Sequence, residues 1–428
     1  MALEALRRLG RALRHPPFRR YVAGNAVNLV GFWMQRIAIG WLTWTLTGST
    51  TWLGIMACAD LGPVLLVGPL AGALADRVDR FRLARRTQAL VLVQSGLLAG
   101  LTLAGALNIY GLLALVLVQG VLYACWQPVR LALIPSLVEP ADLPSAIALN
   151  AILFNAARFV GPAIAGVLLV GPGAGTVFAL HTLGVGWFLW VLARTEPLRL
   201  PPAPRPGTRL LAELRDGLRY VVGHPGIGPF LLLLGVTCLC LRPVLELLPG
   251  FADRVFDRGA GGLAALAAAT GAGAVIGGVL VGQRAGSQGL TRQMILGSLA
   301  LCGCLLGFLA SDRFGVALAA LGLAGLLFTL AGASGQTLLQ QAVDDGLRGR
   351  VLALYGMILR AGPALGALVM GWAADTAGLR PPVAAGVALA LLGWGWAWRR
   401  RATLTATLEA APGPCPGQPE RGTRPSRG

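Results

Sequence analysis

The chain has 428 residues, of which 55% are hydrophobic and only 13% are charged. Soluble domains carry about 25% charged residues, so this composition excludes an ordinary soluble enzyme or binding domain and predicts a polytopic membrane protein. A formal net charge of +18 is compatible with a nucleic-acid partner, but the distribution of the charge argues against one. Most arginines lie in the amino terminus, in the loops of one side and in the carboxyl tail, where they suit a bilayer with an anionic inner leaflet.

The amino-terminal region precedes the first apolar span. Residues 3–20 place leucines among arginines at helical spacing, which predicts an amphipathic helix on the inner membrane surface; residues 1–20 therefore form a cytoplasmic segment of their own. The first span, 21–46, is unusually polar because it holds Asn28, Gln35 and Arg36. A helix facing lipid would not tolerate that set, so one face of this span is expected to line a cavity.

The second span, 52–75, carries Asp60 near the middle of the membrane. Asp60 and Arg36 are equally distant in sequence from Gly48, at the tip of the hairpin that joins the two spans, so they lie at the same depth. This geometry predicts an ion pair. Two interpretations remain open: a static structural pair, or a pair that opens when a proton or the substrate binds.

The turn after the second span packs charges of both signs ahead of the third span, 87–107. A tight turn rich in arginine between two spans is expected on the cytoplasmic side, so this turn orients the whole chain. The other spans are expected near 111–129, 145–170, 176–193, 227–250, 261–282, 292–310, 314–337, 351–372 and 379–398. About twelve spans place both termini in the cytoplasm of a multi-pass inner-membrane protein.

The sequence of that turn resembles a known family. Seven residues fit the conserved loop between helices 2 and 3 of the major facilitator superfamily: Gly72, Leu74, Ala75, Asp76, Arg77, Arg80 and Arg82. Asp79 replaces a glycine of that pattern and Phe81 a basic residue. The resemblance implies an inner gate formed by Gly72, Asp76, Arg77, Asp79, Arg80 and Arg82; an ordinary positive-inside loop is the alternative. It also implies an all-α membrane protein with two pseudo-symmetric six-helix bundles.

The fifth span holds Asn155 and Arg158 ahead of a glycine-proline segment. The residues Gly161, Pro162 and Gly166 resemble the antiporter motif of this superfamily, with alanines at two of its glycine positions. The resemblance implies a kinked, tightly packed helix that seals against its neighbour and limits leak, and a generic helix-packing stripe is the alternative. In the sixth span, His181 is expected to be a packed polar residue rather than a proton relay.

Residues 195–226 interrupt the apolar pattern with a proline-rich stretch and then an apolar stripe beside charges. They predict a cytoplasmic linker with an amphipathic helix between bundles of 21–194 and 227–398. In the second bundle, Arg360 precedes Gly362 and Pro363 much as Arg158 precedes Gly161 and Pro162, which indicates an internal repeat. Residues 399–428 are expected to form a disordered basic tail.

Six charges lie within the predicted spans, where each is costly unless it faces the interior or finds a partner. They are Arg36, Asp60, Arg158, Arg242, Glu246 and Arg360. Arg242 and Glu246 stand four residues apart and are predicted to pair along one helix face. No acid lies within the predicted spans that hold Arg158 and Arg360, which favours an anionic or carbonyl-rich substrate. We expect Asp60 to be the proton-coupling carboxylate, with Asn28, Gln35 and Asn155 in the same cavity.

Four segments, 33–38, 46–49, 127–166 and 347–351, resemble a bacterial exporter branch of the superfamily that includes enterobactin exporters, of the transmembrane secretion effector type. The resemblance implies an efflux carrier for a small molecule such as a siderophore, drug or metabolite. No nucleotide-binding loop, catalytic triad or metal-ligand spacing occurs, so we expect no enzyme, cofactor or metal. A monomeric proton-coupled exporter working by alternating access is the leading hypothesis; a facilitator, an importer and a non-transporting scaffold are its rivals.

Overall fold

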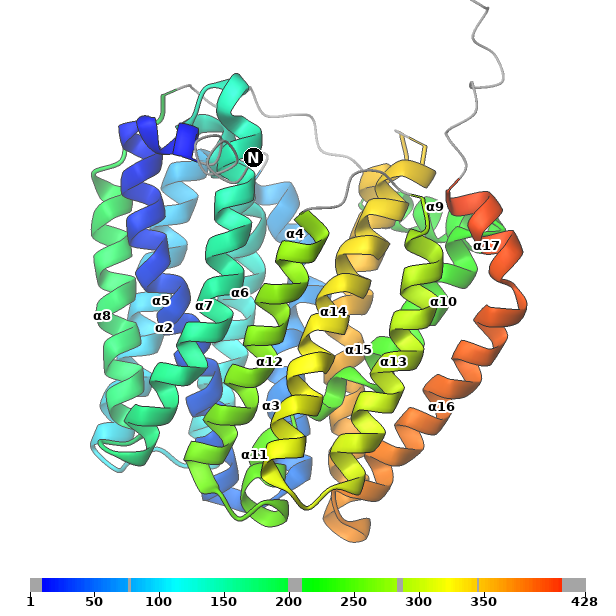
Figure 1. Ribbon diagram of the computed structural model, residues 1–428. Coiled ribbons are helices and arrows are strands. Elements are labelled where there is room, and N and C mark those ends of the chain that lie inside the picture. Colours follow the sequence, from blue (N-terminus) through cyan, green and yellow to red (C-terminus); the bar gives the residue numbers. More distant parts are fainter. Residues whose placement is uncertain (1–9, 76–77, 199–209, 283–287, 345, 410–428) are drawn as a thin grey trace, which may run out of the picture.

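The structure is a computed structural model that describes residues 10–75, 78–198, 210–282, 288–344 and 346–409. Its helices run side by side as one bundle, and the described part of the chain contains no strand (Figure 1). The first described residues, from Gly10 on, and the last helix lie at the same end of the bundle, which we call the terminal end (Figure 1). The opposite end, where the turn at Gly48 lies, is called the far end.

The first half of the chain forms six membrane-crossing elements. They are α2 (Pro16–Thr47), α3 (Thr50–Leu61) continued by α4 (Pro63–Ala75), α5 (Arg80–Leu103), α6 (Ile109–Leu137), α7 (Leu143–Val170) and α8 (Ala174–Ala193), with the short 3₁₀ helices η1 (Arg11–Arg14) and η2 (Pro140–Asp142) at the terminal end.

The second half follows the helix α9 (Leu210–Gly223). Its membrane-crossing elements are α10 (Ile227–Cys240) with the short turns η3 (Arg242–Leu245), α11 (Leu248–Gly250) and η4 (Phe251–Val255), then α12 (Gly259–Gly282), α13 (Leu290–Ala310), α14 (Phe314–Ala342), α15 (Arg348–Ala377) and α16 (Arg380–Arg399), and α17 (Arg401–Leu408) ends the described chain.

Ten helical segments are long and apolar enough to cross a membrane in the part of the chain that the structure describes. The helices α2 and α5, with 32 and 24 residues, are also long enough at 1.5 Å per residue, but they carry more polar side chains. Both pack against α8 inside the bundle. The fold is therefore the predicted all-α bundle of two six-helix halves.

Small residues set how the two repeats pack. A Cβ added at Gly161 of α7 would lie 2.6 Å from Trp33 Cβ in α2, and one added at Gly362 of α15 would lie 2.7 Å from Cys238 Cβ in α10. Each of these motifs thus presses its own helix against the first helix of the same half. The same two helices also contact the other half, since α7 packs on α12 and α15 packs on α3.

The apolar core shows how the halves meet. At the terminal end, one buried cluster contains residues between Ala12 and Leu192 and another contains residues between Val221 and Leu408, so each stays within its own half. At the far end, Trp44 and Leu53 of the first half join a cluster formed by the second half. Among the described residues the halves are therefore closed together by apolar packing at the far end.

Three sequence-based predictions need correction. The amphipathic helix predicted over 3–20 is wrong for its described part, because His15 is extended before Pro16 and residues 16–20 are the first turns of α2. The tail does not begin as a disordered segment at Arg399, since α17 packs two buried leucines and Glu409 accepts hydrogen bonds from the N–H groups of Gly289 and Thr291, both at 2.8 Å.

The seventh span is not the continuous helix predicted over 227–250. The regular helix α10 ends at Cys240, and the chain then continues as short 3₁₀, α and π turns to Val255. Pro243 and Pro249 each lack an N–H and disfavour a continuous helix, so the irregular backbone follows from their placement. Such backbone is tolerated at membrane depth where it is covered by protein.

Candidate functional site

Three charged side chains meet between the halves of the bundle. Arg36 of α2 places Nη2 2.7 Å from Glu246 Oε1 and Nη1 3.7 Å from Asp60 Oδ2. Glu246 follows η3 in the second half, whereas Asp60 lies in α3 of the first half. The contact with Asp60 is the one that their matched depths predict. The shorter contact, with Glu246, joins the two halves and was not predicted.

The predicted pair of Arg242 with Glu246 is wrong. Arg242 is the first residue of the 3₁₀ helix η3 and Glu246 directly follows it, and in a 3₁₀ helix side chains three apart, rather than four apart, share a face. Arg242 instead lies with its guanidinium 5.2 Å from the centre of the Phe328 ring. The broken seventh span thus turns Glu246 toward Arg36 and leaves Arg242 in a cation–π contact.

Trp33 sits between two arginines at the edge of this cluster. The guanidinium of Arg36 lies 5.8 Å and that of Arg158 5.6 Å from the indole centre. The indole Nε1 of Trp33 is buried without a hydrogen-bond partner in the described protein. The site therefore offers positive charge, an aromatic surface and a free N–H donor.

Two other candidate residues lie apart from this cluster. Asn155 donates a hydrogen bond to the carbonyl of Ala151 on its own helix, at 2.9 Å, and Arg360 donates to the carbonyl of Gly356, at 3.2 Å. Within the described residues neither side chain has a contact with the central charges. Of the predicted cavity residues, Arg36, Asp60 and Glu246 meet directly, and Arg158 joins them through the shared Trp33 ring, whereas Arg242 contacts Phe328.

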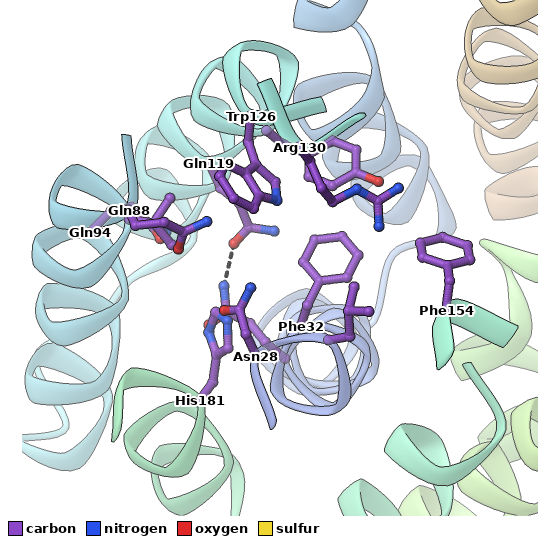
Figure 2. A pocket seen from close by; sticks show the side chains of 13 residues that line it. Asn28, Phe32, Gln88, Gln94, Gln119, Trp126, Arg130, Phe154 and His181 are labelled. Atoms are coloured by element: carbon purple, nitrogen blue, oxygen red, sulfur yellow. Dashed lines mark hydrogen bonds between the residues drawn. The ribbon is translucent and has the colours of Figure 1, made fainter. Parts of the chain in front are cut away.

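A chain of side-chain hydrogen bonds leads from Asp60 into the first half. Gln119 of α6 donates to Asp60 Oδ1 at 3.4 Å, Gln35 donates to Gln119, and His181 Nδ1 is bonded to Gln35 Oε1. Figure 2 shows Gln119 and His181 approaching one another from α6 and α8. Gly31 lets His181 of α8 come close to α2 and thus to Gln35, because a Cβ at Gly31 would lie 2.8 Å from His181 Cδ2.

The polar chain borders a small cavity within the first half. The cavity measures about 40 Å³ and is lined by side chains from α2, α5, α6, α7 and α8 (Figure 2). Its polar lining comprises Asn28, Gln35, Gln88, Gln94, Gln119, Tyr123, Arg130 and His181. Sequence reasoning identified Asn28 and Gln35 but missed Gln119, and it expected His181 to be a packed polar residue, which agrees with its burial and its bond to Gln35. The signal was present, since each is a polar residue in an otherwise apolar span.

The predicted inner-gate motif is only partly described. Asp76 and Arg77 lie outside the described residues, and for Gly72 only its place in α4 is known. Asp79 caps α5 by accepting a hydrogen bond from the N–H of Arg82 at 2.8 Å, and Arg80 donates to the carbonyl of Ala132 at 3.5 Å. Asp79 is therefore the N-cap residue of the helix that forms the third span, a position that aspartate and other short polar residues commonly occupy.

A carboxylate closes the far end between the halves. Asp375, near the end of α15, accepts five hydrogen bonds of 2.6–3.2 Å from the backbone and hydroxyl groups of Ser49, Thr50 and Thr51 at the start of α3. A carboxylate at a helix N-terminus is favoured by the unpaired N–H groups and the helix dipole. Nearby, Trp44 Nε1 donates to Asp253 at 2.8 Å, again across the halves.

Comparison with known proteins identifies the chain's relatives. The family profile described as transmembrane secretion effector matches residues 11–411. An enterobactin exporter of Shigella boydii is 28% identical over 369 residues, which cover 83% of this chain and 85% of that protein. A staphyloferrin A transporter of Staphylococcus aureus is 30% identical over 164 residues, or 38% of this chain and 41% of that transporter.

Solved structures share the fold. A bacterial homologue of the human lysosomal transporter Spinster, in an inward-facing and unoccupied conformation, superposes with a TM-score of 0.72 over 94% of this chain and 100% of that chain, at 14% identity. The human organic anion transporter MFSD10 gives a TM-score of 0.61 over 89% of this chain and 99% of its own, at 17% identity.

Proposed function

Since the chain belongs to the transmembrane secretion effector family of the major facilitator superfamily and is a multi-pass membrane transporter rather than an enzyme, we propose that it is a proton-coupled exporter of a small anionic molecule. It works by alternating access, with two bundles of 21–194 and 227–398 rocking about the central charges. The arginine-rich terminal end faces the cytoplasm, beside anionic inner-leaflet lipid, and the protein works as a monomer.

The observation that carries this proposal is the sharing of Arg36 by one carboxylate from each half. Neutralising one member of a buried ion-pair network leaves the remaining charges poorly compensated. A proton on Asp60 or Glu246 therefore weakens the attraction of that carboxylate for Arg36. That change loosens a contact between the halves and frees a guanidinium to bind substrate. Proton binding and the change of access then depend on one another.

The chemistry around Arg36 supports an anionic substrate. Arg36 contacts two carboxylates, while Arg158 lies against the same Trp33 ring and has no ion-pair partner among the described residues. Guanidinium groups bind carboxylates and other oxyanions through paired N–H donors. Trp33 adds a ring face and an N–H donor that has no partner in the described protein. Relatives named for the siderophores enterobactin and staphyloferrin A are in keeping with a substrate rich in oxygen acceptors.

A strain lacking the gene, screened for accumulation of or sensitivity to siderophores, drugs and metabolites, identifies the substrate. Enterobactin and staphyloferrin A are the first probes. Everted membrane vesicles energised by respiration should then accumulate the identified compound, and an uncoupler should abolish the accumulation. Flux that ignores pH and the uncoupler would indicate a facilitator, and neutral replacement of all six membrane charges without consequence would indicate a scaffold.

A further inference from the structure

The cavity of the first half carries polar groups that its protein surroundings leave unsatisfied. Gln88 and Gln94 of α5 are 2% and 3% exposed, yet the Oε1 atom of each has no hydrogen-bond partner in the described protein. The Nε of Arg130 is likewise buried and unpartnered. Figure 2 shows these side chains around the same space, opposite Asn28 and His181. A buried polar atom without a partner is costly, so such groups bind water where there is room.

The space fits water rather than a larger ligand. A cavity needs roughly 10–15 Å³ to hold one water molecule, so about 40 Å³ accommodates about three. Two amide oxygens accept hydrogen bonds and the guanidinium donates one, which matches the capacity of water to do both.

Unsatisfied polar groups continue from the cavity toward the terminal end. Tyr21, Asn25 and Asn28 follow one another on α2 at spacings of four and three residues, so they share a helix face. Both side-chain polar atoms of Asn25 and the hydroxyl of Tyr21 are buried without a partner, and both residues are 0% exposed. Near the terminal end of α7, Asn150 has an unpartnered Oδ1 as well.

At its other limit the cavity reaches Asp60 through Gln119. The N···O distance of 3.4 Å is long for an N–H···O hydrogen bond, for which 2.7–3.2 Å is usual. Close helix packing brings the two residues together, because a Cβ at Gly120 would lie 2.7 Å from the carbonyl oxygen of Asp60. A small movement of the Gln119 amide therefore exposes Asp60 Oδ1 to the cavity.

We propose that this cavity and the polar face of α2 hold a chain of water molecules that carries protons between Asp60 and the terminal end, apart from the substrate site. When Asp60 releases its proton, the Oδ1–H bond breaks, a water molecule becomes hydronium, and the carboxylate returns to Arg36. The titratable or charged side chains that face the cavity are Arg130 and Tyr123 from α6 and His181 from α8; α2, α5 and α7 contribute amides and apolar groups. His181, through Gln35, positions Gln119.

This inference rests on the proposed role of Asp60, and its test needs no transported substrate. The full-length protein in lipid nanodiscs is labelled with ¹⁵N-histidine. The chain has three histidines, so replacing His15 and His224 by glutamine leaves the His181 signal alone. We expect magnetisation transfer between water and the His181 ring. A His181 ring without water contact would show a dry cavity and overturn the proposal.

The second measurement follows the carboxyl C=O infrared band that disappears in Asp60→Asn after a rapid rise in pH. In Asn25→Leu, which removes no hydrogen bond within the described protein, the Asp60 deprotonation rate should fall about tenfold, equivalent to about 1.4 kcal/mol in the barrier. Gln88→Leu should act in the same way and serves if Asn25→Leu does not fold. Thr43→Val is the matched control, because Thr43 is a buried polar residue of α2 that bonds only to its own helix.

The outcomes separate the two proposals. An Asp60 rate that is unchanged in Asn25→Leu and Gln88→Leu overturns the water route while leaving proton coupling at Asp60 intact. Absence of any carboxyl band that depends on Asp60 overturns the coupling role itself, and the route with it.

Discussion

Arg36 is the residue on which the proposed coupling depends. It is held by Glu246 at 2.7 Å and lies 3.7 Å from Asp60, and the three side chains are between 14% and 23% exposed. Breaking a buried pair by removing one partner costs about 3–5 kcal/mol, because the remaining charge is left uncompensated. Protonation of one carboxylate can therefore change the relative free energies of two conformations by enough to shift their populations.

Glu246→Gln tests the contact that joins the halves. Glutamine keeps the volume and can still accept a hydrogen bond from Arg36, but it removes the negative charge, so folding should be retained. We expect uphill accumulation in everted vesicles to fall at least about tenfold, which corresponds to about 1.4 kcal/mol. The same change at the exposed Glu196 is the control. Normal accumulation by Glu246→Gln would show that the charge of Glu246 is not needed, and proton coupling would then be assigned to Asp60 alone.

Single residues could be predicted only where local spacing determines the contact. The matched depths of Arg36 and Asp60 follow from a hairpin, so their proximity could be derived from the sequence. The partner of Glu246 could not, because it lies 210 positions away in the other half. The chain through Gln119 and His181 depends on four helices packing in one particular arrangement, which spacing within one span does not reveal.

At the scale of helices, α7 and α15 make the most extensive contacts between the two halves, with α12 and α3 respectively. The motif around Gly161 fits α7 against α2, and a Cβ at Gly166 would lie 2.1 Å from the Cβ of Ala264 in α12. On the equivalent helix α15, a Cβ at Gly371 would lie 2.3 Å from the carbonyl of Thr50 in α3. Small residues thus let helices of opposite halves approach closely. In a membrane the hydrophobic effect does not drive helices together, so close packing of this kind stabilises their association.

Gly166→Ala tests this close packing. The added methyl group cannot be accommodated without moving α7 from α12, so we expect the free energy of unfolding to fall by about 1–3 kcal/mol. Gly100→Ala in α5 is the matched control, since nothing lies within 4 Å of its Cβ position and alanine favours a helix by up to about 1 kcal/mol. Thermal unfolding in detergent measures both. Equal stability of the two variants would contradict the packing argument.

Asp375→Asn tests the closure of the far end. The asparagine keeps two polar atoms but loses the charge that favours the N-terminus of α3, and hydrogen bonds to charged groups contribute about 1.5–3 kcal/mol each. We expect backbone amide exchange over residues 44–53 to become at least about tenfold faster by mass spectrometry, because the closed state is less populated. In Asp312→Asn the exchange should not change, since Asp312 pairs with Arg380 inside the second half. Unchanged exchange in Asp375→Asn would show that apolar packing alone closes this end.

Hydropathy located each membrane-crossing element, but several ends differ from the predicted ones by five to eight residues, and the irregularities within the elements were not predicted. The sixth helical segment, by contrast, begins and ends at 174 and 193 where 176 and 193 were predicted. The predicted fourth span ended at 129, whereas α6 continues through Pro128 and Pro135 to Leu137. The breaks in the seventh span were not predicted, because a proline can either break a membrane helix or be accommodated within it. The outcome depends on which neighbouring groups satisfy the freed backbone carbonyls, and hydropathy does not reveal them.

At the scale of the whole molecule, apolar clusters and polar contacts close the far end, while the clusters of the terminal end stay within separate halves. If the terminal end faces the cytoplasm, as its arginines favour, the described contacts close the side of the protein that faces away from the cell interior. In the proposed export cycle, this state would receive substrate from the cell. The return of Arg36 to its two carboxylates would then accompany each cycle of opening and closing.

The most direct test of the central claim compares two activities of Asp60→Asn in the same proteoliposomes. The substitution keeps the volume of the side chain and abolishes its titration. We expect exchange of the identified substrate without a gradient to continue, while uphill accumulation driven by a proton gradient falls at least about tenfold relative to the wild type. Proton-driven accumulation at the wild-type level by a well-folded Asp60→Asn protein would contradict the claim that Asp60 couples proton movement to transport.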